Sequence, residues 1–395
     1  MSRMPSDALS AWKDRLHQGL RGLEARSQRR SLAEIQGVNF CSNDYLGLAE
    51  HSGLRAEVAE AVRLSEKVGG TGSRLLSGQT EEWRDLEDEF AIFAGTESAL
   101  YFTTGYAANV GLLSSLLGKE DVVFSDERNH ASLIDGMRLS GARKVIYPHQ
   151  NLNALDAALR QEGSAPGRKV IVSESVFSMD GDIAPLAELA ALAEKYNAAL
   201  ILDEAHATAV HGPAGHGLAA AAGITSKVLA IIHTCGKALA SAGAFVCGPA
   251  VLKEHLVNHA RTFIFSTALP PYFTAQIRAA LRLAEGMNEE RAMLLHRAAW
   301  FRAALQSEGF ETAGTGSQIV PVVLGHNDAT LDAAEHLQRD GFAVRGIRPP
   351  TVPEGGSRLR LSLTTRISQE ELSRVVHSLV AWRACQTSLA HARHA

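Results

Sequence analysis

The sequence has few of the residues that mark several common classes of protein. It contains four cysteines, none of them in a C-x-x-C pair: Cys41, Cys235, Cys247 and Cys385. This scatter argues against a zinc site and against a disulfide framework, so we interpret all four as thiols of the core. His211 and His216, in a glycine-rich stretch, do not have the i, i+4 spacing of metal ligands on a helix, so we expect no metal there. Other histidines, among them His149, are interpreted as surface residues.

The sequence also lacks an excess of charge and any long apolar run. Lys and Arg number 39 and Asp and Glu number 43, which gives a formal net charge of −4 and no basic excess of the kind that binds nucleic acid. No stretch reaches the roughly 18 apolar residues of a membrane span, and the first 30 residues contain no uninterrupted apolar segment of a secretory signal. We therefore expect a cytoplasmic enzyme with neither a nucleic acid nor a membrane as partner.

What the sequence does contain is an alternation of short β-branched runs with stretches of helical period. The runs predicted as strands are "DVVFSD" (121–126), "KVIYPH" (144–149), "KVIVSES" (169–175), "ALILDEAH" (199–206), "VLAIIHT" (228–234) and "GAFVCG" (243–248). Between them, apolar residues recur at helical spacing, as at Leu86, Phe90 and Phe93. Strands separated by helices predict an α/β domain with a mainly parallel sheet that is covered on both faces.

The length of the chain and a change in its residue pattern indicate more than one structural unit. A chain of 395 residues is too long for one ordinary core. From about residue 286 a long helical stretch is followed by strand-like runs such as "SQIVPVVLG" and "SRLRLSL", and then by a closing amphipathic helix. We predict an N-terminal helical arm over 1–45, a large α/β domain over 46–285 and a smaller α+β domain over 286–395.

Three features carry the chemistry of the predicted site. "ILDEAHATAVHGPAGHG" (201–217) is an apolar run that ends on Asp203, at the sheet edge where ligands bind, although a helix cap or an internal ion pair is also possible there. "HTCGKALASAGAF" places Lys237 in an apolar, glycine-flanked turn, where desolvation would lower the pKa of its amine; a surface lysine is the alternative. In "FTTGYAANVG" a helix begins near Tyr106. The free N–H groups at the start of this helix would hold a phosphate, or would simply be capped by Ser, Thr or Gly.

Together these three features match pyridoxal 5'-phosphate. The ring nitrogen of that cofactor pairs with an Asp, its aldehyde binds a lysine, and its phosphate needs a cluster of donors. In this interpretation Asp203 keeps the ring nitrogen protonated, so that the ring can accept electrons from a carbanion.

Eight stretches of the chain then carry a family resemblance. They are, in order, "NFCSNDYLGL", "GGTGSRLLSGQTEEWRDLE", "NHASLIDGMRLSGA", "SESVFSMDGDIAPL", "LDEAHATAVHGPAGHG", "TCGKALASAGAF", "FIFSTALPP" and "IRPPTVPEGGSRLRLSLT". Over about residues 40–385 the chain resembles the α-oxoamine synthases, a family of fold-type I pyridoxal-phosphate enzymes. The resemblance implies a large domain with a seven-stranded, mainly parallel sheet, a smaller C-terminal α+β domain and an N-terminal helical arm.

The resemblance also implies an activity. Members of this family are acyltransferases that condense an amino acid with an acyl thioester and release CoA and CO₂. The stretches "GSRLLSG" and "IRPPTVP" are more similar to those of the members that join L-alanine to pimeloyl-CoA in biotin biosynthesis than to those of the members that use glycine. The carrier of the acyl group, CoA or an acyl carrier protein, and the length of the acyl chain are left open by the sequence.

For the residues around the cofactor ring, the resemblance implies separate roles. Lys237 binds the cofactor aldehyde and removes the amino-acid α-proton, and Asp203 pairs with the ring nitrogen. His130 of "NHAS" stacks on the ring. Ser178 and His206 hydrogen-bond the phenolic oxygen of the ring and its surroundings.

The phosphate group would be held by residues of two subunits. The resemblance assigns Gly105, Tyr106 and Thr234 to the chain's own phosphate site. It assigns Ser266 and Thr267 of "FSTALPP" to the site of the neighbouring subunit, which implies a homodimer with shared active sites. The alternative is an internal strand with Ser and Thr at its end.

Substrate contacts are implied for four further residues. In "SRLRLSL" two arginines alternate with leucines and so share one face of a strand, and we assign Arg360 to the amino-acid carboxylate. Asn43 and Thr351 are assigned to the acyl substrate, with ordinary turn residues as the alternative. Arg30, or else Arg29, would meet a carboxylate at the far end of the acyl chain.

Three rival functions share some of these features. One is a related condensation that uses glycine or another acyl-CoA. An aminotransferase shares the fold and the lysine, and a cofactor-free binding protein could have kept the fold alone. Release of free CoA from a thioester separates condensation from transamination, and the absence of cofactor absorbance would favour the binding protein.

Overall fold

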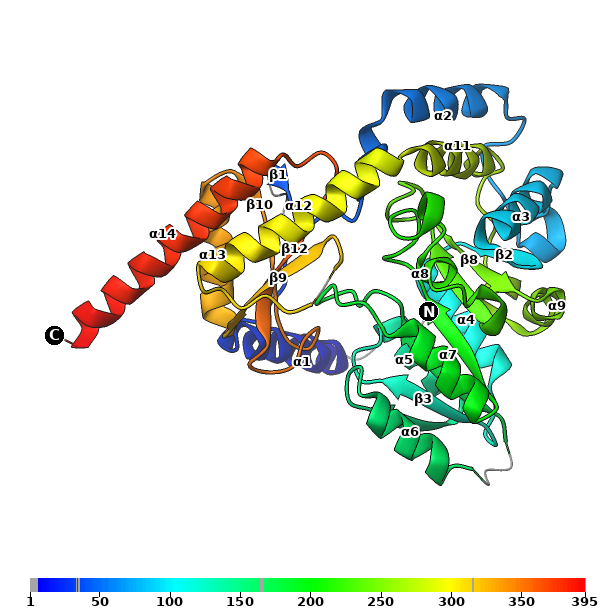
Figure 1. Cartoon of the computed structure of the whole chain (residues 1–395), viewed down its shortest axis with the longest axis horizontal. Helices are drawn as coiled ribbons and strands as arrows, with labels where there is room; N and C mark the ends of the chain where they lie inside the picture. Colours follow the sequence, from blue (N-terminus) through cyan, green and yellow to red (C-terminus); the bar gives the residue numbers. More distant parts are fainter. Residues whose placement is uncertain (1–5, 33, 35, 164–166, 315, 395) are drawn as a thin grey trace.

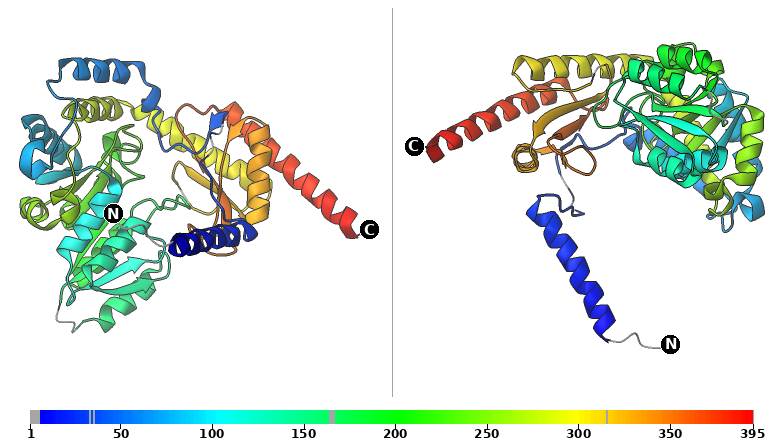
Figure 2. Two further views of the ribbon diagram at one scale, coloured as in Figure 1. Left: turned by 180° about the vertical axis from the view of Figure 1, so that it is seen from behind. Right: turned by 90° about the horizontal axis from the view of Figure 1, so that it is seen from below.

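The computed structural model describes residues 6–32, 34, 36–163, 167–314 and 316–394. It consists of a large unit built on one broad sheet and a smaller unit built on a narrow sheet, which lie side by side in Figure 1. Helix α1 (Ser6–Ala25) extends away from the body of the molecule in Figure 2. None of the helices in the described part of the chain combines the length and the apolarity that a membrane crossing needs.

The large unit contains a seven-stranded sheet in the order β2-β8-β7-β6-β5-β3-β4. Its strands are β2 (Ser98–Phe102), β3 (Val122–Asp126), β4 (Arg143–Tyr147), β5 (Lys169–Glu174), β6 (Ala198–Asp203), β7 (Ala230–Thr234) and β8 (Ala244–Gly248). Strand β8 is antiparallel to both of its neighbours, and the other pairs are parallel. The mainly parallel sheet is therefore confirmed, and all six predicted runs form strands, whereas β2 was not among the predicted strands.

Helices cover both faces of this sheet because its strands are apolar on both sides. In β5, Val170 and Val172 belong to the apolar cluster beneath α4, α5 and α9, whereas Ile171 belongs to the cluster beneath α6 and α7, as the period of a strand requires. The helices of this unit are α2 (Ser52–Leu64), α3 (Glu81–Ala94), α4 (Gly105–Leu116), α5 (Ala131–Ser140), α6 (Leu152–Gln161), α7 (Leu186–Lys195), α8 (Leu218–Ala221), α9 (Ala250–His259), α10 (Arg261–Ile264) and α11 (Tyr272–Gly286). Shorter helical turns are η1 (Leu48–Glu50), η2 (Arg74–Gly78), η3 (Pro213–Gly215) and η4 (Thr225–Lys227).

The smaller unit has a three-stranded antiparallel sheet in the order β11-β12-β9. Its elements are α12 (Asn288–Ser307), β9 (Ile319–Gly325), α13 (Asn327–Arg339), β10 (Phe342–Ala343), β11 (Gly346–Ile347), β12 (Ser357–Ser362) and α14 (Gln369–His394). Strand β1 (Val38–Asn39) pairs with β10, so the segment that follows the arm is joined to this unit. The proposed boundaries at residues 45 and 285 stay predictions.

One interpretation of the cysteines was wrong. Cys235 and Cys247 are buried in the core, and Cys41 is partly buried, but Cys385 is exposed. Cys385 lies on α14 beyond the buried Leu379 and Trp382, where this helix extends past the body of the smaller unit in Figure 1. All four cysteines are free.

Candidate active site

A cavity of about 360 Å³ lies at the carboxyl edge of the large sheet, where β5, β6 and β7 end and α4 and α5 begin. This cofactor-sized pocket is lined by seven of the residues predicted from the sequence: Gly105, Tyr106, His130, Asp203, His206, Thr234 and Lys237. They come from four segments that are far apart in the chain. The fold brings them together because the carboxyl ends of parallel strands share one edge of a sheet.

Asp203 is buried and held by two donors. The backbone N–H of Ala205 donates to Oδ1 at 2.9 Å, and the side chain of Asn109 on α4 donates to Oδ2 at 2.7 Å. Asn109 also donates to Ser132 Oγ at 2.9 Å, which leaves the Ser132 hydroxyl free to donate to Nδ1 of His130 at 2.8 Å. A hydrogen-bond chain therefore connects His130 to the carboxylate of Asp203.

The same chain of hydrogen bonds assigns the tautomer of His130. Its Nδ1 accepts from the Ser132 backbone N–H at 3.3 Å as well as from the hydroxyl, so the proton of the neutral ring is on Nε2. The protein around the ring lowers the pKa of His130, and the charge on Lys237 lowers it further, against the opposite effect of Asp203. The ring is therefore neutral near pH 7 and can lie against an aromatic ligand.

Lys237 lies in the turn after β7, one residue beyond Gly236. Burial lowers the pKa of its amine, Arg360 adds to this effect, and Asp203 and Glu174 oppose it. Within the described residues, no acceptor takes a hydrogen bond from Nζ. The lowered pKa therefore favours the neutral, nucleophilic form of the Lys237 amine.

The pocket contains a second carboxyl group, Glu174, which was not predicted. Glu174 ends β5 beside Asp203 at the end of β6, and its Oε1 is buried without a partner. Burial raises the pKa of Glu174 well above its usual value, and the neighbouring charge of Asp203 raises it further. Burial and the neighbouring carboxylate thus both favour the neutral form of Glu174.

His206 is fixed by a tyrosine that the sequence did not single out. Its Nδ1 lies 2.6 Å from the hydroxyl of the buried Tyr45, which also donates to Asn43 Oδ1 at 3.1 Å. Gln318 of the smaller unit donates to the His206 carbonyl at 2.8 Å. Burial lowers the pKa of His206 well below its usual value, and nearby cations contribute, so the ring is neutral.

The start of α4 forms the other end of the pocket. Thr104 is the N-cap residue, and its hydroxyl accepts from the Ala107 N–H at 3.0 Å. At Gly105 a Cβ atom would lie 2.9 Å from Thr234 Cγ2, so only glycine keeps the first turn of this helix open beside Thr234. The free N–H groups at the start of a twelve-residue helix favour an anion.

These residues fit pyridoxal phosphate. An available amine, a held carboxylate and a helix start suited to a phosphate lie in one cavity, and Oδ1 of Asn109 and Oε1 of Glu174 are buried polar atoms without partners in its wall. Within the described residues, no group of three or more His, Cys, Asp and Glu side chains could hold a metal ion.

Ser266 and Thr267 lie elsewhere. They line a small cleft of about 10 Å³ that they share with Thr103 and Arg74, and neither borders the pocket that contains Lys237. Phe265 beside them is 71% exposed. The chain's own fold thus does not bring the two hydroxyls to its own cofactor pocket.

A larger cavity of about 720 Å³ adjoins the pocket at His130, which lines both. We call it the outer cavity. It contains Arg30, Ser178 and Thr351 of the predicted residues, and Arg30 donates to Thr351 Oγ1 at 3.2 Å. Ser178 therefore faces the outer cavity and does not line the pocket that contains His206.

Arg360 and Asn43 lie between the two units. Arg360 on β12 is 9% exposed, and it donates from Nε to the Ser178 carbonyl at 2.5 Å and from Nη2 to Asn43 Oδ1 at 3.1 Å. A third contact joins its Nη1 to Ser362 Oγ at 2.6 Å. The guanidinium is therefore fixed in position before any substrate binds.

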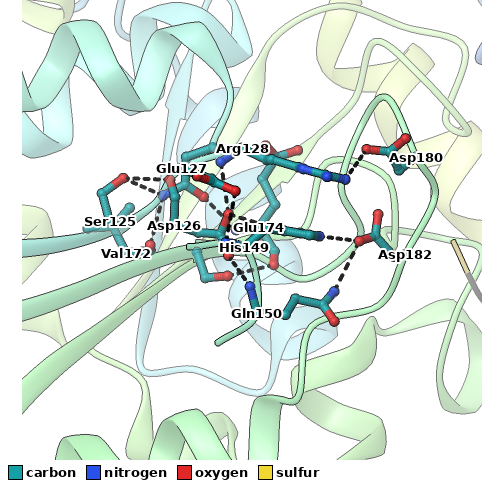
Figure 3. Close-up of polar contacts among 12 residues, drawn as sticks. Ser125, Asp126, Glu127, Arg128, His149, Gln150, Val172, Glu174, Asp180 and Asp182 are labelled. Carbon is teal, nitrogen blue, oxygen red and sulfur yellow. Dashed lines mark hydrogen bonds and ion pairs between the residues drawn. The ribbon is translucent and has the colours of Figure 1, made fainter. Parts of the chain in front are cut away.

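The segment that carries Ser178 is held by ion pairs, which Figure 3 shows. His149 lies between Asp126, at 2.9 Å from Nδ1, and Asp182, which contacts Nε2. Burial favours the neutral ring, but the hydrogen bonds to both carboxylates outweigh it and raise the pKa of His149 to about 9. The interpretation of His149 as a surface residue was therefore wrong, because its partners come from distant segments.

Comparisons with known proteins agree with this geometry. The family model "Aminotransferase class I and II" matches residues 35–379. An 8-amino-7-oxononanoate synthase of Geobacter sulfurreducens is 46% identical over 369 residues, which cover 92% of this chain and 93% of that protein. The crystal structure of an 8-amino-7-oxononanoate synthase from Francisella tularensis has a TM-score of 0.77 and 29% identity, over 89% of this chain and 99% of that one.

A second type of enzyme also has a similar structure. A serine palmitoyltransferase variant from S. paucimobilis, solved with a PLP–myriocin aldimine bound, has a TM-score of 0.84 and 29% identity, over 97% of this chain and 98% of that one. Likeness along nearly the whole length of both chains extends to both structural units. The chain belongs to the aminotransferase class I and II family and, within it, to the family of the 8-amino-7-oxononanoate synthases.

Proposed function

We propose that this chain is a pyridoxal-phosphate-dependent acyltransferase. It condenses L-alanine with pimeloyl-CoA, or with another pimeloyl thioester, to give 8-amino-7-oxononanoate, the free carrier and CO₂, a step of biotin biosynthesis. The observation that carries the proposal is the single pocket in which Lys237, Asp203 with its partner Asn109, and the start of α4 meet. The 46% identity to a protein of that name supports the choice of reaction.

The residues of the pocket divide the work of binding and proton transfer. Pyridoxal phosphate, when bound, supplies an electron sink for a carbanion at the amino-acid α-carbon. Asp203, held by Asn109 and by the backbone, would keep a proton on the ring nitrogen. Lys237 would hold the aldehyde carbon and, once displaced by the substrate amine, take the α-proton at Nζ. His130 would lie against the ring, and Gly105, Tyr106 and Thr234 would hold the phosphate.

Arg360 would set which bond of the amino acid breaks. Its guanidinium is fixed by Ser178 and Asn43, and a bidentate contact to the amino-acid carboxylate would fix the angle of the α-carbon. Ser178 and His206 would act around the phenolic oxygen, His206 from its anchored position beside Tyr45. The outer cavity would take the acyl thioester, with Thr351 and Arg30 of its lining as contacts. Asn43, which does not line this cavity, would contact the acyl substrate from its position beside Arg360.

The reaction is tested with a matrix of substrates. L-Alanine, glycine and L-serine are each combined with pimeloyl-CoA and with shorter acyl-CoA thioesters, and free CoA and CO₂ are measured. We expect the largest release of both from L-alanine with pimeloyl-CoA. Preference for L-serine would favour a reaction like that of the serine palmitoyltransferases, and amino-group transfer without CoA release would overturn the proposal.

The active unit is proposed to be a homodimer with shared sites. Ser266 and Thr267 lie outside the chain's own pocket. Exposed apolar side chains stand near them, at the adjacent Phe265 (71%) and at Leu76 (86%) on η2, which contacts α10. An isologous contact would bring each pair of hydroxyls to the partner's phosphate site.

Subunit mixing tests the shared site. Inactive Lys237→Ala subunits are mixed with inactive Ser266→Ala/Thr267→Ala subunits. Shared sites predict that heterodimers recover one intact site of two. Sites built within one chain predict no recovery, even after subunit exchange has been verified.

A further inference from the structure

The loop that carries Ser178 is in contact with both structural units. We call residues 176–183 the Ser178 loop. Val176 and Ile183 form an antiparallel bridge that closes the loop at its base. A closed loop of this kind moves as one piece, so a contact on one side of it can fix a contact on the other side.

On the side of the large unit, the loop is held by His149. Burial favours the neutral ring, but Asp126 and Asp182 raise the pKa of His149 to about 9, so both ring nitrogens carry a proton near pH 7. Nδ1 then donates to Asp126 at the end of β3, at 2.9 Å, and Nε2 donates to Asp182 of the loop, as Figure 3 shows. The ring also packs edge-on against Phe177, with the ring centroids 4.5 Å apart. His149 therefore joins the end of β3 to the Ser178 loop.

Asp182 depends on this contact. His149 is its cationic partner, Gln150 donates to Oδ2 at 3.3 Å, and Oδ1 is buried without a partner. A second ion pair, 2.5 Å long, joins Arg128 to Asp180 of the loop, but Arg128 is 42% exposed, whereas His149 is 12% exposed. Removing the cation of a desolvated pair costs more than removing that of a solvated pair, so His149 is the firmer anchor of the loop.

On the side of the smaller unit, the loop holds Arg360. The Ser178 carbonyl accepts from Nε of Arg360 at 2.5 Å, and Arg358 on the same strand contacts Asp180. The backbones are also close, because a Cβ atom at Gly314 would lie 2.0 Å from the Asp180 carbonyl oxygen. The direction of the Arg360 guanidinium therefore follows the position of the Ser178 loop.

The position of Arg360 relative to the cofactor pocket bears on the chemistry. Arg360 lies on β12 of the smaller unit, whereas Lys237 and Asp203 belong to the large unit. An amino acid with its carboxylate at Arg360 and its α-carbon at Lys237 must span the two units. A misplacement of about 1 Å in such an arrangement can cost roughly 100-fold in rate.

We propose that His149 is a positioning residue for the amino-acid substrate. It holds Asp182, and with it the Ser178 loop, so that the Ser178 carbonyl keeps the guanidinium of Arg360 directed at the amino-acid carboxylate. The proposal rests on the proposed function, in which Arg360 binds that carboxylate. His149 itself lines neither the cofactor pocket nor the outer cavity, so it acts through Arg360 and not by touching a substrate.

The test measures how well the enzyme distinguishes a carboxylate from its neutral amide. L-Alanine and L-alaninamide are titrated into enzyme loaded with pyridoxal phosphate, and each Kd is taken from the change in the visible absorbance of the cofactor. The Kd of L-alaninamide divided by that of L-alanine is the discrimination ratio, and each variant is compared with the wild type at the same pH. In Arg360→Lys the ratio should fall by at least about tenfold, because lysine cannot make the bidentate contact.

Two substitutions of His149 separate its two contacts. An Asn amide lies near the position of Nδ1 and a Gln amide near that of Nε2, so His149→Asn can keep Asp126 and loses Asp182, whereas His149→Gln can keep Asp182. The discrimination ratio should fall at least about fivefold in His149→Asn and less than about twofold in His149→Gln. The Kd of pyridoxal phosphate should stay within about threefold of the wild type in both. Equal losses in the two variants, or a ratio within about twofold of the wild type in His149→Asn, would overturn the proposal.

A double-mutant cycle tests the route through Arg360. If His149 acts through Arg360, adding His149→Asn to Arg360→Lys should lower the ratio by less than about twofold more, because the bidentate contact is already lost. Additive losses would mean that His149 acts by another route, against the proposal. His255→Asn is the matched control, because His255 on α9 is also partly buried and its Nε2 lies 2.9 Å from the Ser115 carbonyl. It should leave the ratio unchanged.

The wild type and Arg360→Lys separate the two claims. If the wild type binds no L-alanine, the proposed function fails and the role of His149 fails with it. If Arg360→Lys keeps the discrimination ratio of the wild type, the assignment of Arg360 is wrong, and so is the role of His149. If Arg360→Lys loses the ratio and His149→Asn keeps it, only the role of His149 is wrong.

Discussion

The cofactor pocket and the outer cavity are built in different ways. The pocket is formed by strand ends and helix starts of one sheet, and its charged and polar side chains are held by near neighbours, as Asp203 is by Asn109 and His206 by Tyr45. The outer cavity is formed by four parts of the chain, namely the arm, the stretch 127–134 at the start of α5, the segment around Asp180 and the smaller unit, and Arg30 and Thr351 there are exposed. A rigid pocket suits chemistry that needs fixed geometry, whereas a cavity assembled from several parts suits the selection of a substrate.

If this contrast is right, the pocket should be the less tolerant of the two. Lys237→Ala should lower turnover by at least about 1,000-fold, since proton transfer alone contributes roughly 10² to 10⁴-fold and the covalent anchor of the cofactor is lost as well. CoA release measures the turnover, and the visible absorbance of the bound cofactor should change with it. Lys227→Ala is a matched control, because Lys227 is a surface lysine paired with Glu194 at 3.1 Å. Retention of more than a few per cent of activity would remove Lys237 from its proposed role.

A milder change within the pocket separates binding from chemistry. Asp203→Asn keeps the shape of the side chain but removes its charge and one of the two oxygens that accept from Ala205 and Asn109, so we expect the cofactor to bind and turnover to fall by roughly 100-fold. Cofactor content after purification and the rate of exchange of the alanine α-proton with solvent are the measurements. Normal proton exchange in this variant would show that Asp203 does not control the electron sink.

Much of the pocket could be predicted because its residues stand at recognisable positions. Asp203 ends an apolar strand, Lys237 lies in the turn after the next one, and Gly105 begins a helix, so each has a local signal. Asn109 and Tyr45 have none, since their importance comes from contacts with Asp203 and His206 that lie 94 and 161 residues away in the sequence. Such pairs follow from the tertiary fold and leave no pattern along a single chain.

Two further features were missed for related reasons. Strand β2 has the sequence "SALYF", which contains no Val, Ile or Thr and follows α3 closely, so its pattern does not stand out from the helix before it. The pairing of Arg128 with Asp180 joins residues 52 positions apart in two loops. Loops have no period, so the side chains of the outer cavity were the least predictable part of the site.

The ion pairs of His149 should make the stability of the fold sensitive to pH. Burial opposes the charge on His149, but Asp126 and Asp182 outweigh it and raise its pKa to about 9 in the folded chain. In the unfolded chain the pKa is about 6.5. The charged ring therefore stabilises the fold fully below about pH 6.5, and this contribution is lost as the pH rises to about 9.

Urea unfolding at two pH values measures this effect. The difference in unfolding free energy between the wild type and His149→Asn should be roughly 2 kcal/mol larger at about pH 6 than at about pH 9.5, after allowance for solvent screening of the ion pairs. A difference that is the same at both pH values would mean that His149 acts through neutral hydrogen bonds and packing alone.

The smallest effect is expected at the exposed edge of the outer cavity. Arg30 donates to Thr351 at 3.2 Å, and both side chains are open to solvent, so a contact from Arg30 to the acyl substrate is screened. Arg30→Leu should raise KM for pimeloyl-CoA by roughly threefold to fivefold, or about 1 kcal/mol, and leave kcat nearly unchanged.

Arg29→Leu is the matched control and the alternative assignment, because Arg29 is also exposed but pairs with Glu24 at 3.1 Å and does not line the outer cavity. Raising the salt from about 0.05 M to about 0.5 M should remove most of the difference between Arg30→Leu and the wild type, since the Debye length falls well below 10 Å over that range. An effect of Arg30→Leu that persists at high salt would indicate a desolvated contact, and the outer cavity would then be as tightly built as the cofactor pocket.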